Sequence, residues 1–297
     1  TSRWDGNAFG TSWSIRFRSS MREEESAVRS IVEAELERIE STLSHWSSES
    51  ETNQFNQSQT TSPMEGSLEF LTLIAHAQRL SESTEGLYDI TMGPLVDAWG
   101  YGPSGPKERE PSEEELERLL SSTGWKKIAI DFDAKTIRKL VPNIQVDLGS
   151  LLQGYAVDQI VLVLDEKLPA GSEYLIDVGG ELYGRGVWEV GIENPIDPSK
   201  LVAHARLQDA ALATSGVYRS QRQVSGRRVH HLISPRTGRP YPCNFELCSV
   251  QAVRCIDADG LATAGMLLSA DELHALSLKQ GFDFWAVDSE GKLIRSR

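Results

Sequence analysis

Apolar and polar residues follow two periodicities near the start of the chain. Residues 11–18 alternate between apolar and polar side chains, which predicts a half-buried strand. Ser20 and Glu23 then form a capping-box signal, and apolar residues recur at helical spacing as far as Leu43. This pattern predicts a long amphipathic helix.

Further along the chain the predicted elements are shorter and more varied. Residues 47–64 are rich in Ser, Thr, Asn and Gln and predict a long polar loop. Residues 144–148 predict a strand, and Gly149 is expected to begin the helix that follows it. The remaining predictions are helices near 68–80, 111–120, 259–268 and 271–279, a hairpin over 128–140, and strands near 174–178, 182–186, 188–192, 203–213, 230–233, 245–254 and 284–288.

The order of these elements indicates the fold class. Long helices stand near the start, middle and end of the chain, and most strands lie between them. Partial segregation of helices and strands favours an α+β fold with mostly antiparallel sheets and flanking helices. No repeat or linker divides the chain, so we expect one two-lobed domain over residues 1–297.

Composition and charge exclude several classes of protein. The chain has 297 residues, 39% hydrophobic and 25% charged, as in ordinary globular proteins. No apolar run approaches the roughly 18 residues of a membrane span. The net charge of −13 disfavours nucleic acid as a partner. Three cysteines are too few for a disulfide framework, and their spacing fits no common zinc pattern, so we expect small buried side chains.

Three polar stretches could contribute to a binding site, each with an ordinary structural alternative. Trp46 lies among serines and could stack on a flat ligand, or simply fold back onto the surface. Residues 88–100 mix Gly, Pro, apolar and acidic residues and suit either the rim of a pocket or a buried turn. Residues 146–158 predict a strand, a glycine turn and a helix whose first N–H groups could hold an anion, although many such turns hold nothing.

Two further stretches carry residues suited to catalysis. His230 and His231 titrate near neutral pH and could transfer a proton, although isolated histidines are more often structural. Asp259 and Thr263 are four residues apart, so they share one helix face and offer the hard oxygen atoms that Mg²⁺ prefers. The structural alternative for Asp259 is a helix start that complements the dipole. Ser215 lies outside a nucleophile-elbow motif, so a serine hydrolase gains no support.

Taken together, the order and spacing of these stretches resemble the FAD:protein FMN transferase (ApbE) family over most of the chain. The matching pieces are Asp89-Ile90-Thr91-Met92-Gly93-Pro94-Leu95-Val96, Asp147-Leu148-Gly149, Gly154-Tyr155-Ala156-Val157-Asp158, Gly179-Gly180, Thr214-Ser215-Gly216 and Pro235-Arg236-Thr237-Gly238. The resemblance implies an ApbE-like fold and an Mg²⁺-dependent enzyme. Such an enzyme moves FMN from FAD to a Thr or Ser hydroxyl of a flavoprotein and releases AMP.

The resemblance also implies a role for individual residues. His231 falls on the histidine near the acceptor hydroxyl, and we expect it to be the base, with His230 as the competing candidate. Ser150, through its carbonyl, and Asp259 and Thr263, through their side chains, fall on the metal ligands. The residues that fall on FAD-binding positions are Phe9, Trp46, Leu87, Tyr88, Asp89, Asp147, Gln153 and Ile233.

Three residues depart from the family pattern. Gln153 stands where Lys is frequent, Ser234 stands where Asp usually precedes Pro, and Glu181 stands where Asp is common after Gly-Gly. None of these replaces a proposed metal ligand, but the first removes a cation near the nucleotide. These departures bring into question the affinity for the adenine half of FAD and the turnover of the enzyme.

Two alternatives to the transferase therefore stay open. One is an FAD pyrophosphatase that yields FMN and AMP, for which Asn56 is the residue to test. The other is a non-catalytic FAD-binding protein. The resemblance further implies an acceptor with an Asp-x-x-(Ser/Thr)-Gly-Ala-(Ser/Thr) segment, and a full-length protein that acts outside the cytoplasmic membrane, in the periplasm or anchored to the membrane.

Overall fold

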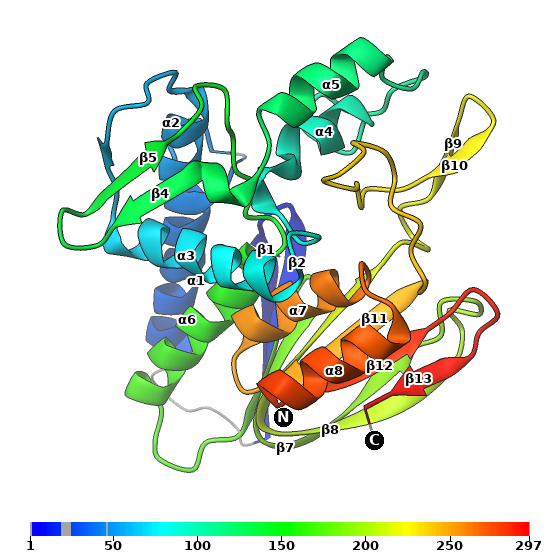
Figure 1. Cartoon of the computed structure of the whole chain (residues 1–297). Helices are drawn as coiled ribbons and strands as arrows, with labels where there is room; N and C mark the ends of the chain where they lie inside the picture. Colours follow the sequence, from blue (N-terminus) through cyan, green and yellow to red (C-terminus); the bar gives the residue numbers. More distant parts are fainter. Residues whose placement is uncertain (1, 19–24, 46, 297) are drawn as a thin grey trace. The chain divides into compact units, whose positions relative to one another are not determined.

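A computed structural model describes residues 2–18, 25–45 and 47–296 of the chain (Figure 1). The chain forms two compact units, and each unit is built from separate stretches of sequence. Unit 1 comprises Thr1–Ser41, Ser150–Gly216 and Asn244–Arg297, and unit 2 comprises Thr42–Gly149 and Val217–Cys243. Among the described helices, none is both long and apolar enough to span a bilayer.

Unit 1 is organised around an eight-stranded sheet whose neighbouring strands all pair antiparallel. The strands, in their spatial order, are β1 (Ser2–Ala8), β2 (Thr11–Phe17), β6 (Tyr174–Val178), β7 (Glu181–Glu193), β8 (Leu201–Gly216), β11 (Leu247–Ala252), β12 (Asp283–Val287) and β13 (Leu293–Arg295). The alternation predicted for residues 11–18 is confirmed, because Trp13, Ile15 and Phe17 on β2 are all buried.

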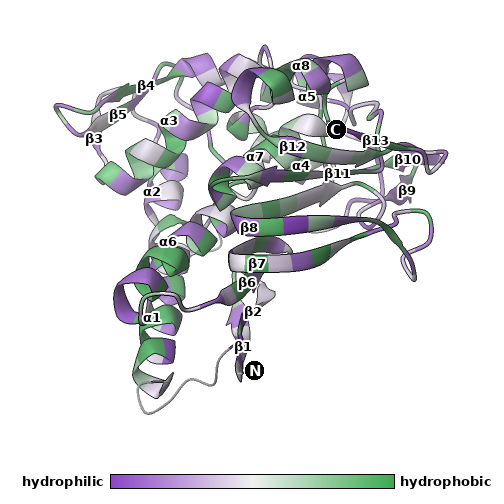
Figure 2. Cartoon of the chain, turned by 90° about the horizontal axis from the view of Figure 1, so that it is seen from below, coloured by the Kyte–Doolittle hydropathy of each residue, from purple (hydrophilic) through white to green (hydrophobic). Residues whose placement is uncertain are grey.

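The helices of unit 1 are α1 (Glu25–Leu43), whose last residues belong to unit 2, α6 (Leu152–Lys167), α7 (Cys255–Gly265) and α8 (Ala270–Gln280). Helices α6 and α7 contact each other and pack on strands β6, β7, β8 and β11 (Figure 1). Their colouring in Figure 2 mixes apolar and polar residues, as expected of helices that pack on a sheet on one side. Helix α8 begins with a capping box between Ser269 and Glu272.

Unit 2 contains helices of 6 to 16 residues and two small antiparallel sheets. Its helices are α2 (Glu51–Gln57), α3 (Leu68–Ser83), α4 (Gly93–Ala98) and α5 (Glu113–Ser121), with the 3₁₀ turns η1 (Ile90–Met92) and η2 (Trp125–Lys127). Its strands are β3 (Met64–Glu65), β4 (Ile128–Asp131), β5 (Thr136–Lys139), β9 (Arg222–Val224) and β10 (Arg227–Val229). Ser67 and Ser112 cap α3 and α5 by accepting backbone N–H bonds.

The structure confirms the predicted α+β fold and corrects several element boundaries. The predicted loop over residues 47–64 contains α2 and the first residue of β3. Residues 144–148 are not a strand, because their backbone bonds to a side chain and a turn rather than to a sheet. The helix expected at Gly149 begins at Leu152, and residues 230–233 form only an isolated bridge between Ile233 and Pro240. The predicted cap at residues 20–23 lies outside the described residues.

The cysteines behave as small apolar side chains. All three are free thiols; Cys248 and Cys255 are buried, and Cys243 is half-buried. The expectation of ordinary packing residues is therefore confirmed for Cys248 and Cys255.

Candidate active site

Two oxygen-bearing side chains of unit 1 lie one turn apart on α7. Asp259 is 5% exposed, and one of its carboxylate oxygens accepts the backbone N–H of Gly154 at 3.0 Å. The hydroxyl of Thr263 lies 2.9 Å from the hydroxyl of Ser215 on β8. Asp259 and Thr263 thus share the helix face that the sequence spacing predicts.

Helix α6 fixes the start of α7 through two close contacts. A Cβ atom on Gly154 would lie 2.6 Å from the carbonyl oxygen of Cys255 and 2.7 Å from Cβ of Asp259, so only glycine fits. The carboxylate of Asp158, one turn further along α6, accepts the backbone N–H groups of Cys255 and Ile256 at 2.7 and 3.1 Å. Burial raises the pKa of Asp158 to about 6. The glycine and the aspartate of the Gly154–Asp158 motif therefore position Asp259.

Glu181, at the start of β7, is a buried acid that the sequence reading treated only as a departure from a pattern. Its side chain is 6% exposed, and its Oε2 atom has no hydrogen-bond partner among the residues that the structure describes. Burial, reinforced by the negative charge of Asp259, raises the pKa of Glu181 well above its usual value. The sequence does carry a signal for this buried acid: Glu181 directly follows a Gly-Gly turn and lies among apolar strand residues.

These acids fit a hard divalent cation. Burial also raises the pKa of Asp259, to about 8, so two neighbouring carboxylates resist ionisation until positive charge is supplied. No three His, Cys, Asp or Glu side chains in the described part of the chain gather into a metal cluster. The side-chain oxygens of Asp259 and Thr263 are of the kind that Mg²⁺ prefers, and their assignment as metal ligands, with the carbonyl of Ser150, stays a prediction.

Phe9 and Gln153 lie at two turns of unit 1. Phe9 is 9% exposed and has a φ of 55° in the tight turn between β1 and β2, where it is followed by Gly10. Gln153 lies in the first turn of α6. A Cβ atom on Gly179, which has a φ of 68°, would be 3.2 Å from Nε2 of Gln153 and 3.3 Å from Oε2 of Glu181. The Gly-Gly turn therefore lies against Gln153 and Glu181.

In unit 2, Asp147 connects several of the predicted residues. Its carboxylate accepts the N–H of Gly149 at 2.8 Å and lies 3.4 Å from Nδ1 of His45. Its own backbone N–H donates to the carbonyl of Ile90 at 2.7 Å. Asp147 is therefore held beside the segment that follows residues 87–89.

The residues 87–89 have structural contacts of their own. The carboxylate of Asp89 accepts the N–H and hydroxyl of Thr91 at 2.8 and 2.7 Å and the N–H of Trp125 at 3.0 Å, and burial raises its pKa. Tyr88 is buried and Leu87 is half-buried. The side chain of Asp89 thus stabilises η1, and the assignment of residues 87–89 to FAD stays a prediction.

A cavity of about 800 Å³ lies within unit 2, beside Asp147. Its lining includes His45, Asn56, Tyr101 and Lys107. The side-chain amide of Asn56 exchanges two hydrogen bonds with the backbone of Val146, at 2.9 and 2.7 Å. Asn56 therefore fixes the backbone directly before Asp147 and pairs the N–H and carbonyl groups of Val146 that a sheet would otherwise pair.

His231 is half-buried in unit 2, and its Nδ1 atom lies 2.7 Å from the hydroxyl of Ser220. Burial, with a smaller contribution from His230, lowers the pKa of His231 to about 4. Ile233 is 4% exposed and packs in a cluster that includes Met92 and Leu95. Sequence reasoning missed Ser220, because nothing in its immediate sequence indicates a histidine partner.

The predicted site residues thus form two sets. Unit 1 brings α6, which carries Gln153, against α7, which carries Asp259 and Thr263. Unit 2 brings Asp147 beside the 87–92 segment, against which Ile233 packs. Trp46 lies outside the described residues.

The chain is similar in sequence to known transferases. The family model described as "ApbE family" matches residues 9–284. A relative from Haemophilus influenzae, named FAD:protein FMN transferase, is 32% identical over 95% of this chain and 85% of its own length. A relative of the same name from Escherichia coli K12 is 28% identical over 98% of this chain and 85% of its own length.

Solved structures show the same fold. A flavin transferase ApbE from Vibrio cholerae superimposes with a TM-score of 0.87, at 29% identity, over 99% of this chain and 96% of that chain. The apbe protein from Thermotoga maritima gives a TM-score of 0.88 at 26% identity, over 100% and 97% of the two chains. Fold and relatives together define an enzyme of the transferase class. The chain belongs to the ApbE family.

Proposed function

We propose that the chain transfers the FMN half of FAD to a Ser or Thr hydroxyl of a protein acceptor, with release of AMP and with dependence on Mg²⁺. Support comes from relatives named FAD:protein FMN transferase that align with nearly all of the chain. The structural observation that carries the proposal is the pairing of Asp259 and Thr263 on one face of α7, beside the buried acid Glu181. Hard oxygen donors in this arrangement suit Mg²⁺ rather than a softer metal.

The chain's own residues divide the chemistry between holding the ion and moving a proton. Asp259, Thr263 and the carbonyl of Ser150 would hold Mg²⁺, which when bound neutralises negative charge on the pyrophosphate and the departing AMP. The acceptor oxygen bonds to the FMN phosphorus, and the bond from that phosphorus to the AMP oxygen breaks. The hydroxyl proton passes to Nε2 of His231, which is neutral at physiological pH because burial lowers its pKa to about 4.

The first experiment follows the products. Purified chain is incubated with FAD and Mg²⁺, with and without a peptide that carries the Asp-x-x-(Ser/Thr)-Gly-Ala-(Ser/Thr) segment. AMP release together with a peptide heavier by one FMN supports the transferase. AMP with free FMN and an unmodified peptide supports the pyrophosphatase, and bound FAD without AMP supports a binding protein; either result contradicts the proposal.

The second experiment compares the two neighbouring histidines. We expect His231→Ala to lower the transfer rate by about 100-fold, the typical contribution of a general base. His230→Ala is the matched control, because Nδ1 of His230 accepts the N–H of Leu232 at 3.3 Å and so supports the local backbone. Undiminished transfer by His231→Ala would show that another group is the general base.

We also propose that the full-length protein acts outside the cytoplasmic membrane, in the periplasm or attached to the membrane. The resemblance to the family supports this location. Fractionation of cells that express the full-length gene product tests it, and recovery only with cytoplasmic markers would contradict it.

A further inference from the structure

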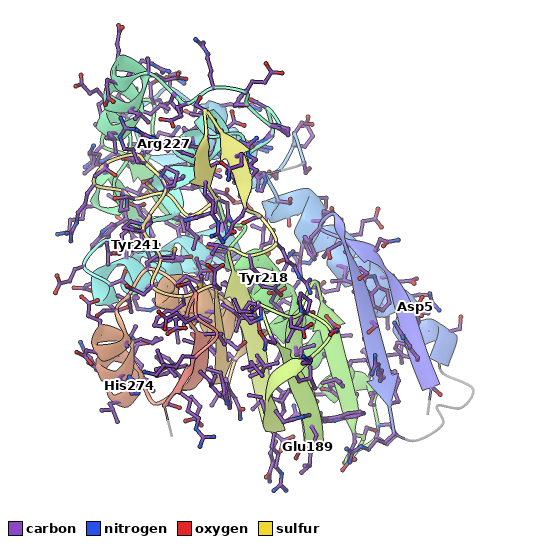
Figure 3. All side chains as sticks on the ribbon, turned by 90° about the vertical axis from the view of Figure 1, so that its right-hand side faces the viewer. Asp5, Glu189, Tyr218, Arg227, Tyr241 and His274 are labelled. Atoms are coloured by element: carbon purple, nitrogen blue, oxygen red, sulfur yellow. The ribbon has the colours of Figure 1, made fainter. Side chains whose placement is uncertain are left out.

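The hydroxyl of Ser220 lies between two groups of unit 2. Ser220 is the last residue of a turn, and its backbone N–H donates to the carbonyl of Val217 at 3.0 Å. Tyr218, labelled in Figure 3, marks this turn. The Ser220 hydroxyl lies 3.2 Å from the same carbonyl and 2.7 Å from Nδ1 of His231. One side-chain oxygen therefore contacts both a carbonyl and an imidazole.

Counting protons couples the directions of the two bonds. A serine hydroxyl has one proton to donate, and a carbonyl oxygen can only accept. When the hydroxyl donates to Val217, the short contact with His231 is a hydrogen bond only if Nδ1 of His231 carries a proton and donates it to the serine oxygen. We propose that Ser220 is a positioning residue that holds neutral His231 with its proton on Nδ1 and the lone pair of Nε2 free.

The surroundings of His231 limit other arrangements of the ring. The ring of Tyr101 meets the imidazole edge-on, with centroids 6.2 Å apart and planes at 63°. Tyr101 is itself held, because its hydroxyl donates to the carbonyl of Val229 at 2.9 Å and the guanidinium of Arg222 lies 4.6 Å from its ring centre. The imidazole is thus restrained by a hydrogen bond and by packing.

The consequence for catalysis rests on the proposed function. A neutral imidazole accepts a proton only at its unprotonated nitrogen, so the tautomer decides which atom can be the base. With Nδ1 occupied by Ser220, the base is Nε2. With the opposite tautomer, Nε2 would carry a proton and His231 would be a hydrogen-bond donor.

Nitrogen chemical shifts test the tautomer without any enzymatic assay. The full chain is labelled with ¹⁵N-histidine, and the signals of His231 are assigned by their loss in His231→Gln. We expect a protonated Nδ1 and an unprotonated Nε2 at neutral pH. A predominantly Nε2-protonated ring overturns the proposal.

Substitutions separate positioning from folding. Ser220→Ala should shift His231 toward a mixture of tautomers and lower the transfer rate by roughly tenfold to 100-fold, part of the contribution of a general base. Ser220→Thr keeps the hydroxyl and should restore both readouts. Ser121→Ala removes an exposed hydroxyl that donates to the carbonyl of Arg118 in α5, and it should change neither readout. A Ser220→Ala protein whose His231 signals match the wild type overturns the proposal, as does failure of Ser220→Thr to restore them.

The two proposals can fail separately. If the expected tautomer is found but His231→Ala transfers FMN normally, the base assignment fails and the role of Ser220 in holding the ring stands. If His231→Ala is inactive but Nε2 is protonated, the base assignment stands and the role of Ser220 fails.

Discussion

At the scale of single residues, buried charge is the feature that distinguishes this chain. Glu181 and Asp259 are both less than a tenth exposed, and each has a raised pKa because burial disfavours its charged form. A buried acid stays neutral unless a nearby positive charge compensates its ionised form. A divalent cation on Asp259 and Thr263 would provide that compensation.

Substitution of Glu181 by Gln should have opposite effects with and without metal. In EDTA, the folded wild type must keep Glu181 protonated or bury its charge, whereas the unfolded chain ionises it freely; Gln removes this cost and should raise the free energy of unfolding by about 1 kcal/mol. With Mg²⁺, the added stabilisation should be smaller than in the wild type, because less negative charge attracts the ion. Thermal unfolding in EDTA and in Mg²⁺ measures both effects.

Glu189→Gln is the matched control for this substitution. Glu189 is exposed on the same strand, β7, as Figure 3 shows. Its removal should change neither measurement by more than a few tenths of a kcal/mol. Equal responses of the two variants to Mg²⁺ would show that Glu181 does not contribute to Mg²⁺ binding.

At the scale of elements, the contact between α6 and α7 positions the acid of the candidate site. Gly154→Ala would place a methyl group 2.6 Å from the carbonyl of Cys255, so the helices must separate. We expect a loss of about 2–3 kcal/mol in the free energy of unfolding and weaker Mg²⁺ binding. Denaturant unfolding and calorimetric Mg²⁺ titration test this prediction.

Leu162→Ala serves as the control on the same helix, because Leu162 is 63% exposed. It should change the stability far less than Gly154→Ala does. A Gly154→Ala protein with wild-type stability would show that α6 and α7 can move apart without cost.

Lys139 joins two elements of unit 2. It is fully buried on β5, where its ammonium donates to the carbonyl of Ser58, just after α2, at 2.6 Å and lies 4.6 Å from the ring centre of Phe55. Burial lowers its pKa from 10.5 to about 8. Below pH 8 the folded chain therefore keeps a buried charge on Lys139, which lowers its free energy of unfolding.

The lowered pKa of Lys139 predicts a pH-dependent stability. Between pH 8 and 10.5 the unfolded lysine holds a proton that the folded one has lost, so the free energy of unfolding rises with pH across this window. Lys139→Met should lack this rise. Across the window, the free energy of unfolding of the wild type should therefore increase by roughly 2–4 kcal/mol more than that of the variant. Urea unfolding from pH 7 to 11 measures it, with exposed Lys135→Met as the control. Parallel curves for wild type and Lys139→Met would contradict the prediction.

At the scale of the whole molecule, neither unit is a continuous piece of chain. The core of unit 2 joins Leu95 and Trp99 to Val229 and Ile233, which lie more than 100 residues later. The indole of Trp99 also donates to the carbonyl of Gly238 at 2.7 Å. Unit 2 therefore depends on both of its segments.

This topology predicts that residues 42–149 do not fold alone. Without residues 217–243, the apolar faces of α4 and α5 lose their partners, so the fragment should show little near-ultraviolet circular dichroism and poor NMR dispersion. The same fragment joined to residues 217–243 through a flexible linker should recover both signals. A native-like spectrum from residues 42–149 alone would contradict the prediction.

Local pattern predicted the elements whose stability is local. The alternation ending at Phe17 indicates β2, and the pattern near residues 111–120 indicates α5, which Ser112 caps, because these signals depend on neighbours along the chain. The pattern over residues 144–148 predicts a strand where the structure has a loop, because apolar residues buried in a loop have the same pattern as those in a sheet. The two cases are distinguished by partners distant in sequence: the side chain of Asn56, 90 residues away, and the turn carbonyl of Ile90.

The sequence by itself determined the fold class, the family resemblance and the helix face shared by Asp259 and Thr263, since each depends on residue types at fixed spacing. Tertiary structure decided which groups meet across long separations: Gly154 with Asp259, Thr263 with Ser215, and the burial that raises the pKa of Glu181. The hydroxyl of Ser220 reaches His231 across eleven residues for the same reason. Packing and desolvation act between elements that the fold brings together, and no local pattern along the chain encodes them.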